Sequence, residues 1–205
     1  MKVLLVNGSS RENGCTATAL GEVARALNDE GVETEFYFIG NQPISDCMAC
    51  HYCRKAGRCV LDDGINEFVD KARSMDGFVF GSPVYYAHPS GRLLTFMDRA
   101  FYSGGNAFDF KPAAAVVSAR RAGTTASMDV INKYFTIKSM PVVSSNYWNA
   151  VHGNTPEEVL QDKEGLMTMR NIGKNMAWLL KCIEAGKASG IQHPDNPKIA
   201  TNFIR

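Results

Sequence analysis

The sequence predicts an α/β fold in which helices cover both faces of a parallel sheet. Short apolar runs alternate along the chain with segments of helical period, as in repeated βαβ units. The first run, residues 3–6, is continuously apolar, which is typical of a parallel strand buried on both faces. With 205 residues, 45% of them hydrophobic, the chain can bury a sizeable core. We therefore expect a single doubly wound domain spanning residues 1–205.

The helix after the first strand is indicated by apolar residues spaced i, i+3, i+4, i+7. These residues are Leu20, Val23, Ala24 and Leu27. Gly31 should end this helix, and residues 33–39 are expected to form the second strand. Asp63 is predicted to cap a helix that starts soon after it. The apolar stripe of that helix consists of Ile65, Phe68, Val69 and Ala72.

The third strand is predicted to begin at Gly77, in "GFVFGSPVYY". The next helix has the stripe Leu93, Phe96, Met97 and Ala100. Residues 113–117 are expected to form a fourth strand, 124–138 a less regular helix, and 142–143 the start of a short fifth strand.

The last predicted helix begins at Pro156, because Thr155 and Glu158 form a capping box around a proline at the first helical position. Its continuation should include Met176 and Ile183. Five strands joined by helices favour the flavodoxin-like strand order 2-1-3-4-5. In such a sheet a ligand binds beyond the carboxyl ends of the strands, between the first and third.

The overall charge excludes two classes of partner. The chain has 22 basic and 21 acidic residues and a net charge of +1, so no broad field favours nucleic acid or an anionic membrane. The apolar run near the N-terminus is too short for a signal peptide or a membrane span. We therefore expect a cytoplasmic protein, in a reducing compartment where structural disulfides are disfavoured.

A phosphate-binding turn is indicated after the first strand, in "NGSSRENGCT". Backbone N–H groups at a helix N-terminus suit an anion, Ser9 and Thr16 add hydroxyl groups, and Arg11 can neutralise charge. The spacing fits neither a nucleoside-triphosphate loop nor a dinucleotide fingerprint. An ordinary polar turn is the alternative. Cys15 is interpreted as a packing residue.

The turn after the third strand can supply the other side of a ligand pocket. Pro83 fixes the chain, while Val84, Tyr85 and Tyr86 offer apolar and aromatic surface on which a flat ring can rest. Packing of these side chains in the fold is the alternative interpretation.

"CMACHYCRKAGRC", residues 47–59, places four of the six cysteines in thirteen positions. Cys47, Cys50 and Cys53 have the C-x2-C-x2-C spacing that wraps thiolates around an iron–sulfur cluster, with Cys59 as a fourth ligand. Tetrahedral zinc, metal-free thiols and a disulfide remain alternatives. Cys182, on a late helix, is interpreted as a buried free thiol.

Taken together, "GSSRENGCT", "SPVYY" followed by "SGRLLTFMDR", "SARRAGT" and the compact cysteine motif resemble the NADPH-dependent FMN reductases of flavodoxin-like fold, and particularly their iron–sulfur flavoprotein branch. The resemblance implies three groups of FMN-binding residues. The phosphate group is Ser9, Arg11, Asn13 and Thr16. The residues flanking the flavin are Pro83, Val84, Tyr85 and Tyr86. The residues near its pyrimidine edge are Ser118, Arg120, Gly123 and Thr124.

The expected function is an FMN-dependent oxidoreductase or electron-transfer flavoprotein with a possible [4Fe-4S] cluster on Cys47, Cys50, Cys53 and Cys59. Electrons would come from NAD(P)H or ferredoxin and pass to a small or protein acceptor, with no catalytic acid or base assigned. A homodimer or homotetramer is expected. The alternatives are a simple NAD(P)H:FMN or quinone reductase without a cluster, and a zinc-binding interaction module without enzymatic activity.

Overall fold

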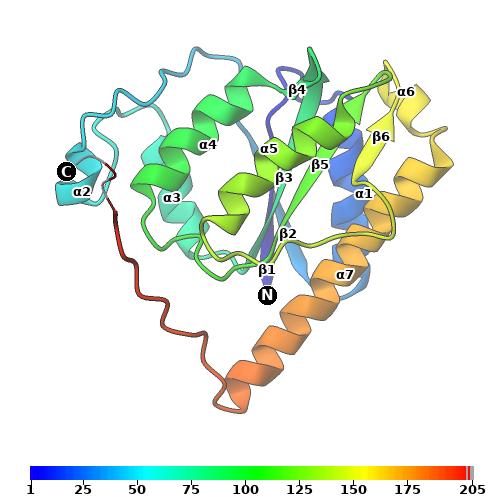
Figure 1. Cartoon of the computed structure of the whole chain (residues 1–205). Coiled ribbons are helices and arrows are strands. Elements are labelled where there is room, and N and C mark those ends of the chain that lie inside the picture. Colours follow the sequence, from blue (N-terminus) through cyan, green and yellow to red (C-terminus); the bar gives the residue numbers. More distant parts are fainter. Residues whose placement is uncertain (202, 204–205) are drawn as a thin grey trace.

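A computed structural model describes residues 1–201 and 203 of the chain. It has an α/β fold with one central sheet (Figure 1). The five parallel strands are β1 (Lys2–Asn7), β2 (Glu33–Phe38), β3 (Gly77–Tyr85), β5 (Ala113–Ala119) and β6 (Ala150–His152). Their order, β2-β1-β3-β5-β6, corresponds to the predicted order 2-1-3-4-5. The predicted fold class is confirmed. One two-residue strand, β4 (His88–Pro89), forms an antiparallel hairpin with the end of β3.

Helices lie on both faces of the sheet (Figure 1). Their bounds are α1 (Cys15–Asp29), α2 (Tyr52–Ala56), α3 (Ile65–Arg73), α4 (Gly91–Ser103), α5 (Thr124–Thr136), α6 (Pro156–Val159) and α7 (Lys163–Ala188). Alternate side chains of β1 divide the core into two clusters. Leu4 and Val6 pack with α3, α4 and α5, whereas Val3 and Leu5 pack with α1 and α7.

The core on the α3, α4 and α5 face is rich in aromatic rings. Phe101 stacks on Phe108 with ring centroids 4.3 Å apart, and Phe80 lies 5.7 Å from Phe101. Burial of each such side chain stabilises the fold by about 1.5–3 kcal/mol. This packing fixes α4 firmly against the sheet, which matters because α4 contacts both parts of the site described below.

The structure corrects three local predictions. The fifth strand is split: Val142 makes only an isolated parallel bridge with Ala113, and regular pairing begins at Ala150 after a polar loop. The helix at Pro156 ends at Val159, since Asp162 accepts a hydrogen bond from Gly165 and starts the separate helix α7. Asp63 does not cap α3.

Gly64 occupies the cap position of α3 instead, with a φ of 88°. The Asp63 carboxylate pairs with Arg99 on α4. The charge-assisted contact of Asp63 with Arg99, 36 residues away, takes the place of the predicted helix cap.

The parallel register brings the predicted ligand-binding turns to one edge of the sheet. Asn7 is opposite Gly81, and Pro83 is opposite Ser118, so the carboxyl ends of β1, β3 and β5 are neighbours. The segment after β2 leads to residues 47–59, which include α2 and lie beside α3 and α4 (Figure 1). Within the described residues, no helix combines the length and apolar character that crossing a bilayer requires.

Candidate functional site

The turn after β1 is held in a compact shape by its own polar groups. The Gly8 N–H donates to the Gly81 carbonyl at 2.9 Å, which ties the turn to β3. The Ser9 N–H donates to Asn7 Oδ1 at 3.0 Å, and the Ser9 hydroxyl accepts from the Arg11 N–H at 3.0 Å. Ser9 is buried, whereas the Arg11 side chain is exposed. The loop thus has a fixed backbone and a positive charge at its surface.

Helix α1 begins immediately after this turn and presents its N-terminus to it. The N–H groups of its first turn have no intrahelical acceptor, and no side chain caps the helix at Gly14 to accept from them. Thr16, in that first turn, is buried with its Oγ1 2.8 Å from Ser118 Oγ. Asn13, two residues before α1, is exposed. Free N–H groups, the Ser9 and Thr16 hydroxyls and the helix dipole together suit a phosphate group.

Cys15 occupies the first position of α1 but is not an activated thiol. Its sulfur lies 3.7 Å from the Gly153 carbonyl, and the residue packs against the α1 and α7 side of the core. Burial raises the pKa of the Cys15 thiol, which keeps it protonated at neutral pH. This agrees with the packing role predicted for it.

The hairpin formed by β3 and β4 carries the second group of predicted residues. Val84 pairs with Pro89 and Tyr85 with His88. At the tip, Tyr86 and Ala87 have positive φ angles of 51° and 59°. Non-glycine residues rarely adopt such angles, and they concentrate at functional sites.

Side chains of this hairpin differ in exposure. Pro83 and Val84 are half-buried, Tyr85 is half-exposed, and Tyr86 is fully exposed. The hairpin therefore offers an apolar base and an aromatic rim at the carboxyl edge of the sheet.

The third group of predicted residues follows β5 and touches this hairpin. Ser118 is buried at the end of β5, Arg120 is exposed, and Thr124 is half-buried at the start of α5. Gly123 caps α5 with a φ of 89°. A Cβ atom at Gly123 would lie 2.4 Å from Ala87 Cα, so the turn and the hairpin tip are in direct contact.

Ser90 joins the first two groups. It is the first residue of "SGRLLTFMDR", and sequence reasoning gave it no role of its own. Its hydroxyl donates to the Gly8 carbonyl at 2.8 Å, and its N–H donates to Ser82 Oγ at 2.9 Å. The same hydroxyl accepts from the Leu93 N–H and caps α4. A serine directly before the apolar stripe of a helix is the signal that could have identified it.

The predicted FMN-binding residues are thus brought together from three loops at one edge. Hydroxyl and N–H groups gather at the α1 end, and apolar and aromatic side chains gather at the hairpin. A phosphate fits the first region and a flat ring fits the second. The residues present therefore suit FMN.

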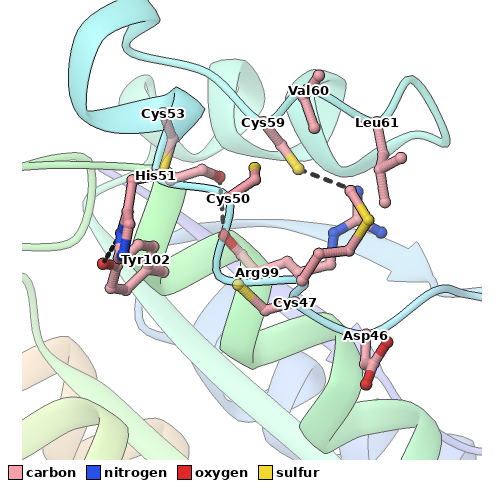
Figure 2. A pocket seen from close by; sticks show the side chains of 12 residues that line it. Asp46, Cys47, Cys50, His51, Cys53, Cys59, Val60, Leu61, Arg99 and Tyr102 are labelled. Carbon is pink, nitrogen blue, oxygen red and sulfur yellow. Dashed lines mark hydrogen bonds between the residues drawn. The ribbon is translucent and has the colours of Figure 1, made fainter.

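The four clustered cysteines share one pocket beside α4 (Figure 2). Cys47 and Cys50 are exposed, whereas Cys53 and Cys59 are half-buried. All are free thiols, and burial raises the pKa of Cys53. Within the described residues, no three His, Cys, Asp or Glu side chains are arranged to hold a metal ion. The donor set suits a thiolate-bound metal centre, but the sulfur atoms stand apart around the pocket.

Arg99 reaches into this pocket from α4 (Figure 2). It is the last residue of "SGRLLTFMDR", and sequence reasoning did not connect it with the cysteines. Its side chain is only 1% exposed. One terminal nitrogen, Nη2, donates to Asp63 Oδ1 at 2.8 Å and to Cys59 Sγ at 3.2 Å. The other, Nη1, donates to the Ser45 carbonyl at 3.1 Å and to Asp63. The hydrogen bond to Arg99 lowers the pKa of Asp63, so both partners are charged at neutral pH.

Further contacts hold the cysteine segment to α3 and α4. Asn66 on α3 accepts from the Cys59 N–H at 2.8 Å and donates to the Cys59 carbonyl at 3.1 Å. Tyr102 on α4 accepts from Arg54 at 2.9 Å and lies 3.3 Å from His51 Nδ1. His51 thus contacts Tyr102 at the outer edge of the pocket.

The sixth cysteine corrects another prediction. Cys182 lies on α7 and is exposed rather than buried. It does not line the pocket that the four clustered cysteines share.

Comparison with known proteins decides the family. The sequence pattern described as NADPH-dependent FMN reductase matches residues 1–155, well over half of the chain. An iron–sulfur flavoprotein of Methanocaldococcus jannaschii is 34% identical over 195 residues, covering 90% of this chain and 100% of the relative. The chain belongs to the NADPH-dependent FMN reductase family, in its iron–sulfur flavoprotein branch. An iron–sulfur flavoprotein of Methanosarcina thermophila is 28% identical over 192 residues, covering 91% of this chain and 99% of the relative.

Solved structures confirm the fold of this family member. RosB, with a bound 8-demethyl-8-formylriboflavin-5'-phosphate intermediate, aligns with a TM-score of 0.71 at 14% identity and covers 100% of this chain and 92% of its own. A flavodoxin from the domain Archaea aligns with a TM-score of 0.60 at 16% identity, covering 88% of this chain and 99% of its own. At these identities the likeness concerns the fold alone.

Proposed function

We propose that this chain binds FMN at the carboxyl edge of β1, β3 and β5, and that electrons from NAD(P)H or reduced ferredoxin pass through it to a small or protein acceptor. Family membership supports a flavoprotein with redox activity. The observation that carries the proposal is the convergence of three loops, through the contacts Thr16 to Ser118, Ser90 to Gly8 and Gly123 to Ala87.

The phosphate of FMN would be held by the turn after β1. Ser9, Asn13 and Thr16 would donate hydrogen bonds together with the free N–H groups of α1, and Arg11 would neutralise charge. Because Ser9 and Thr16 are already fixed by contacts within the fold, little ordering would be needed on binding.

The ring of FMN would lie beside the contact between the hairpin and the turn after β5. Pro83, Val84, Tyr85 and Tyr86 would flank it, while Ser118, Arg120, Gly123 and Thr124 would meet its pyrimidine edge. When bound, FMN supplies the one-electron or hydride chemistry itself. The side chains position the ring and shield one face from water, and we assign no acid or base among them.

We further propose that Cys47, Cys50, Cys53 and Cys59 bind one [4Fe-4S] cluster. Their C-x2-C-x2-C spacing, their shared pocket and the names of the two archaeal relatives support this. The exposed positions of Cys47 and Cys50 leave that part of the segment free to close around a cluster. Such a centre is compatible with the reducing cytoplasm.

Helix α4 provides a structural connection between the two proposed centres. Its N-terminus contacts the FMN loops through Ser90, and its C-terminal half contacts the cysteine pocket through Arg99 and Tyr102. We propose a homodimer or homotetramer, in which exposed aromatic surface such as Tyr86 and Trp148 is covered.

A cluster-free NAD(P)H:FMN or quinone reductase is the second candidate, because the described sulfur atoms are not arranged around a metal position. Anaerobic purification followed by metal analysis and visible spectroscopy separates the candidates. We expect a yellow FMN protein with iron and sulfide, reduced by NADPH or by reduced ferredoxin. FMN without iron or sulfide, even after anaerobic reconstitution, would leave the simple reductase, and zinc without a yellow chromophore would overturn the whole proposal.

A further inference from the structure

We propose that Arg99 is a positioning residue for the Cys59 ligand and that its N–H···S hydrogen bond raises the reduction potential of the cluster. This inference rests on the proposed function, because it requires the cluster to be present. It concerns a side chain on α4, outside the cysteine motif itself.

Cys59 is the cysteine whose position is fixed before any metal binds. Asn66 on α3 holds both its backbone N–H and its carbonyl, and Arg99 on α4 donates to its sulfur at 3.2 Å. In the described part of the chain, the other three clustered cysteines receive no hydrogen bond to sulfur from a side chain. Cys59 is therefore already positioned as a ligand, and the rest of the motif can close toward it.

Arg99 is itself held rigidly. Asp63 accepts from both of its terminal nitrogens, and the Ser45 carbonyl accepts from one of them. A planar guanidinium gripped in this bidentate way keeps its remaining N–H directions fixed. Lysine, with a single ammonium group, could not make the same set of contacts.

The positive charge of Arg99 and the negative charge of Asp63 do not act equally on the Cys59 sulfur. The Arg99 side chain is 1% exposed, whereas that of Asp63 is 29% exposed, so water screens the carboxylate more than the guanidinium. The nearer charged group to the sulfur is the positive one, since Arg99 touches Cys59 directly. Arg99 Nε is buried and has no partner among the described residues, which leaves one more donor of this group unused.

A hydrogen bond to a ligand sulfur stabilises the reduced cluster more than the oxidised one. Reduction by one electron adds one negative charge to the cluster and its thiolates, and a donated N–H and a buried cation both favour that charge. Loss of the Arg99 contact should therefore make the midpoint potential more negative.

The test is an anaerobic redox titration of the full-length FMN-loaded protein, with dithionite as electron donor and low-temperature electron paramagnetic resonance as readout. Arg99→Gln removes the charge and the bidentate pair with Asp63. We expect the equilibrium constant for reduction of its cluster to fall at least tenfold. This corresponds to a midpoint potential about 59 mV more negative for one electron. Arg99→Lys keeps the positive charge but loses the planar guanidinium. Its midpoint potential should lie between those of Arg99→Gln and wild type.

Arg54→Gln is the matched control, because it removes the same charge from the cysteine segment at an exposed position that contacts Tyr102 rather than a sulfur. Its midpoint should stay close to that of wild type. Asp63→Asn removes a negative charge near the sulfur while its amide oxygen can still accept from Arg99. The midpoint should then shift in the opposite, positive direction.

An unchanged midpoint in Arg99→Gln, with iron and sulfide at the wild-type level, would overturn the inference while leaving the cluster in place. If Arg99→Gln does not fold, Arg99→Lys and Asp63→Asn decide: shifts of opposite sign support the inference, and unchanged midpoints in both overturn it. If wild type holds no iron or sulfide, the proposed cluster fails first and this inference fails with it.

Discussion

Gly123→Ala tests whether the hairpin of β3 and β4 and the turn after β5 together form the FMN ring site. Gly123 has a φ of 89°, and a Cβ atom there would lie 2.4 Å from Ala87 Cα and 2.9 Å from Val84 Cγ1. Both neighbours belong to the hairpin, and the closest atom is backbone. The hairpin must therefore move to accommodate a single methyl group.

Two costs contribute to the effect. A left-handed backbone angle at an alanine costs about 1–2 kcal/mol, with or without FMN. Displacement of the hairpin adds a cost that is specific to ring binding. We expect FMN affinity to fall by about tenfold to a hundredfold, which corresponds to roughly 1.4–2.8 kcal/mol.

The matched control is Gly31→Ala. Gly31 has a similar φ of 79°, but a Cβ atom there would meet no described atom within 4 Å, and the residue follows the far end of α1. Both variants should lose unfolding free energy in denaturant titrations of the FMN-free protein. Fluorescence titration with FMN should show weaker binding in Gly123→Ala alone. Equal FMN affinity in Gly123→Ala and wild type would refute the placement of the ring beside this contact.

The remaining predictions concern the phosphate, the cysteines, acid stability and assembly. Arg11→Ala should weaken FMN binding by about 1.5–3 kcal/mol in a calorimetric titration, because a charge-assisted phosphate contact is lost; unchanged affinity would show that Arg11 does not bind phosphate. Cys59→Ala should abolish the iron–sulfur signal in electron paramagnetic resonance, whereas Cys182→Ser should keep it; a cluster retained in the first variant would remove Cys59 from the ligand set. The hydrogen bond from Arg99 holds the pKa of Asp63 below 3.8, so its stabilising contribution is present above that pH and is lost as pH falls through the lower folded value. Asp63→Asn should therefore lower the unfolding free energy at neutral pH and weaken its dependence on pH in the acid range, and an unchanged acid titration curve would contradict this. Light scattering at micromolar concentration should give the mass of a dimer or tetramer, and a strictly monomeric mass would rule out the proposed assembly.

Most of the fold was predictable because its signals are local and repeated. The apolar stripe of α1 and the continuous run in β1 are buried as predicted, and the strand order follows from the usual handedness of βαβ units. Edge elements were less predictable. Pairing at the last strand depends on how the loop between Val142 and Ala150 leaves the sheet. The hydrophobic pattern of the sequence does not indicate the path of this loop.

The loops of the candidate site were predictable from the sequence, but the residues that hold those loops in place were not. Glycine, hydroxyl and cysteine spacing identified the turns, since each turn is continuous in sequence. Arg99 and Ser90 lie in "SGRLLTFMDR", which carried part of the family resemblance. Neither was given a role of its own, because their partners lie 40 and 82 residues away. Arg99 does not share the i, i+3, i+4, i+7 spacing of the α4 stripe, so the sequence indicated neither its burial nor its pairing with Asp63.

The central claim is that one chain carries both FMN and a four-cysteine cluster. The most direct measurement is iron, sulfide and FMN analysis of anaerobically purified and reconstituted wild type beside Cys59→Ala. The account predicts iron and sulfide equivalent to one [4Fe-4S] cluster per FMN in wild type, and FMN with its cluster lost in the variant. FMN with no iron or sulfide in wild type would contradict it.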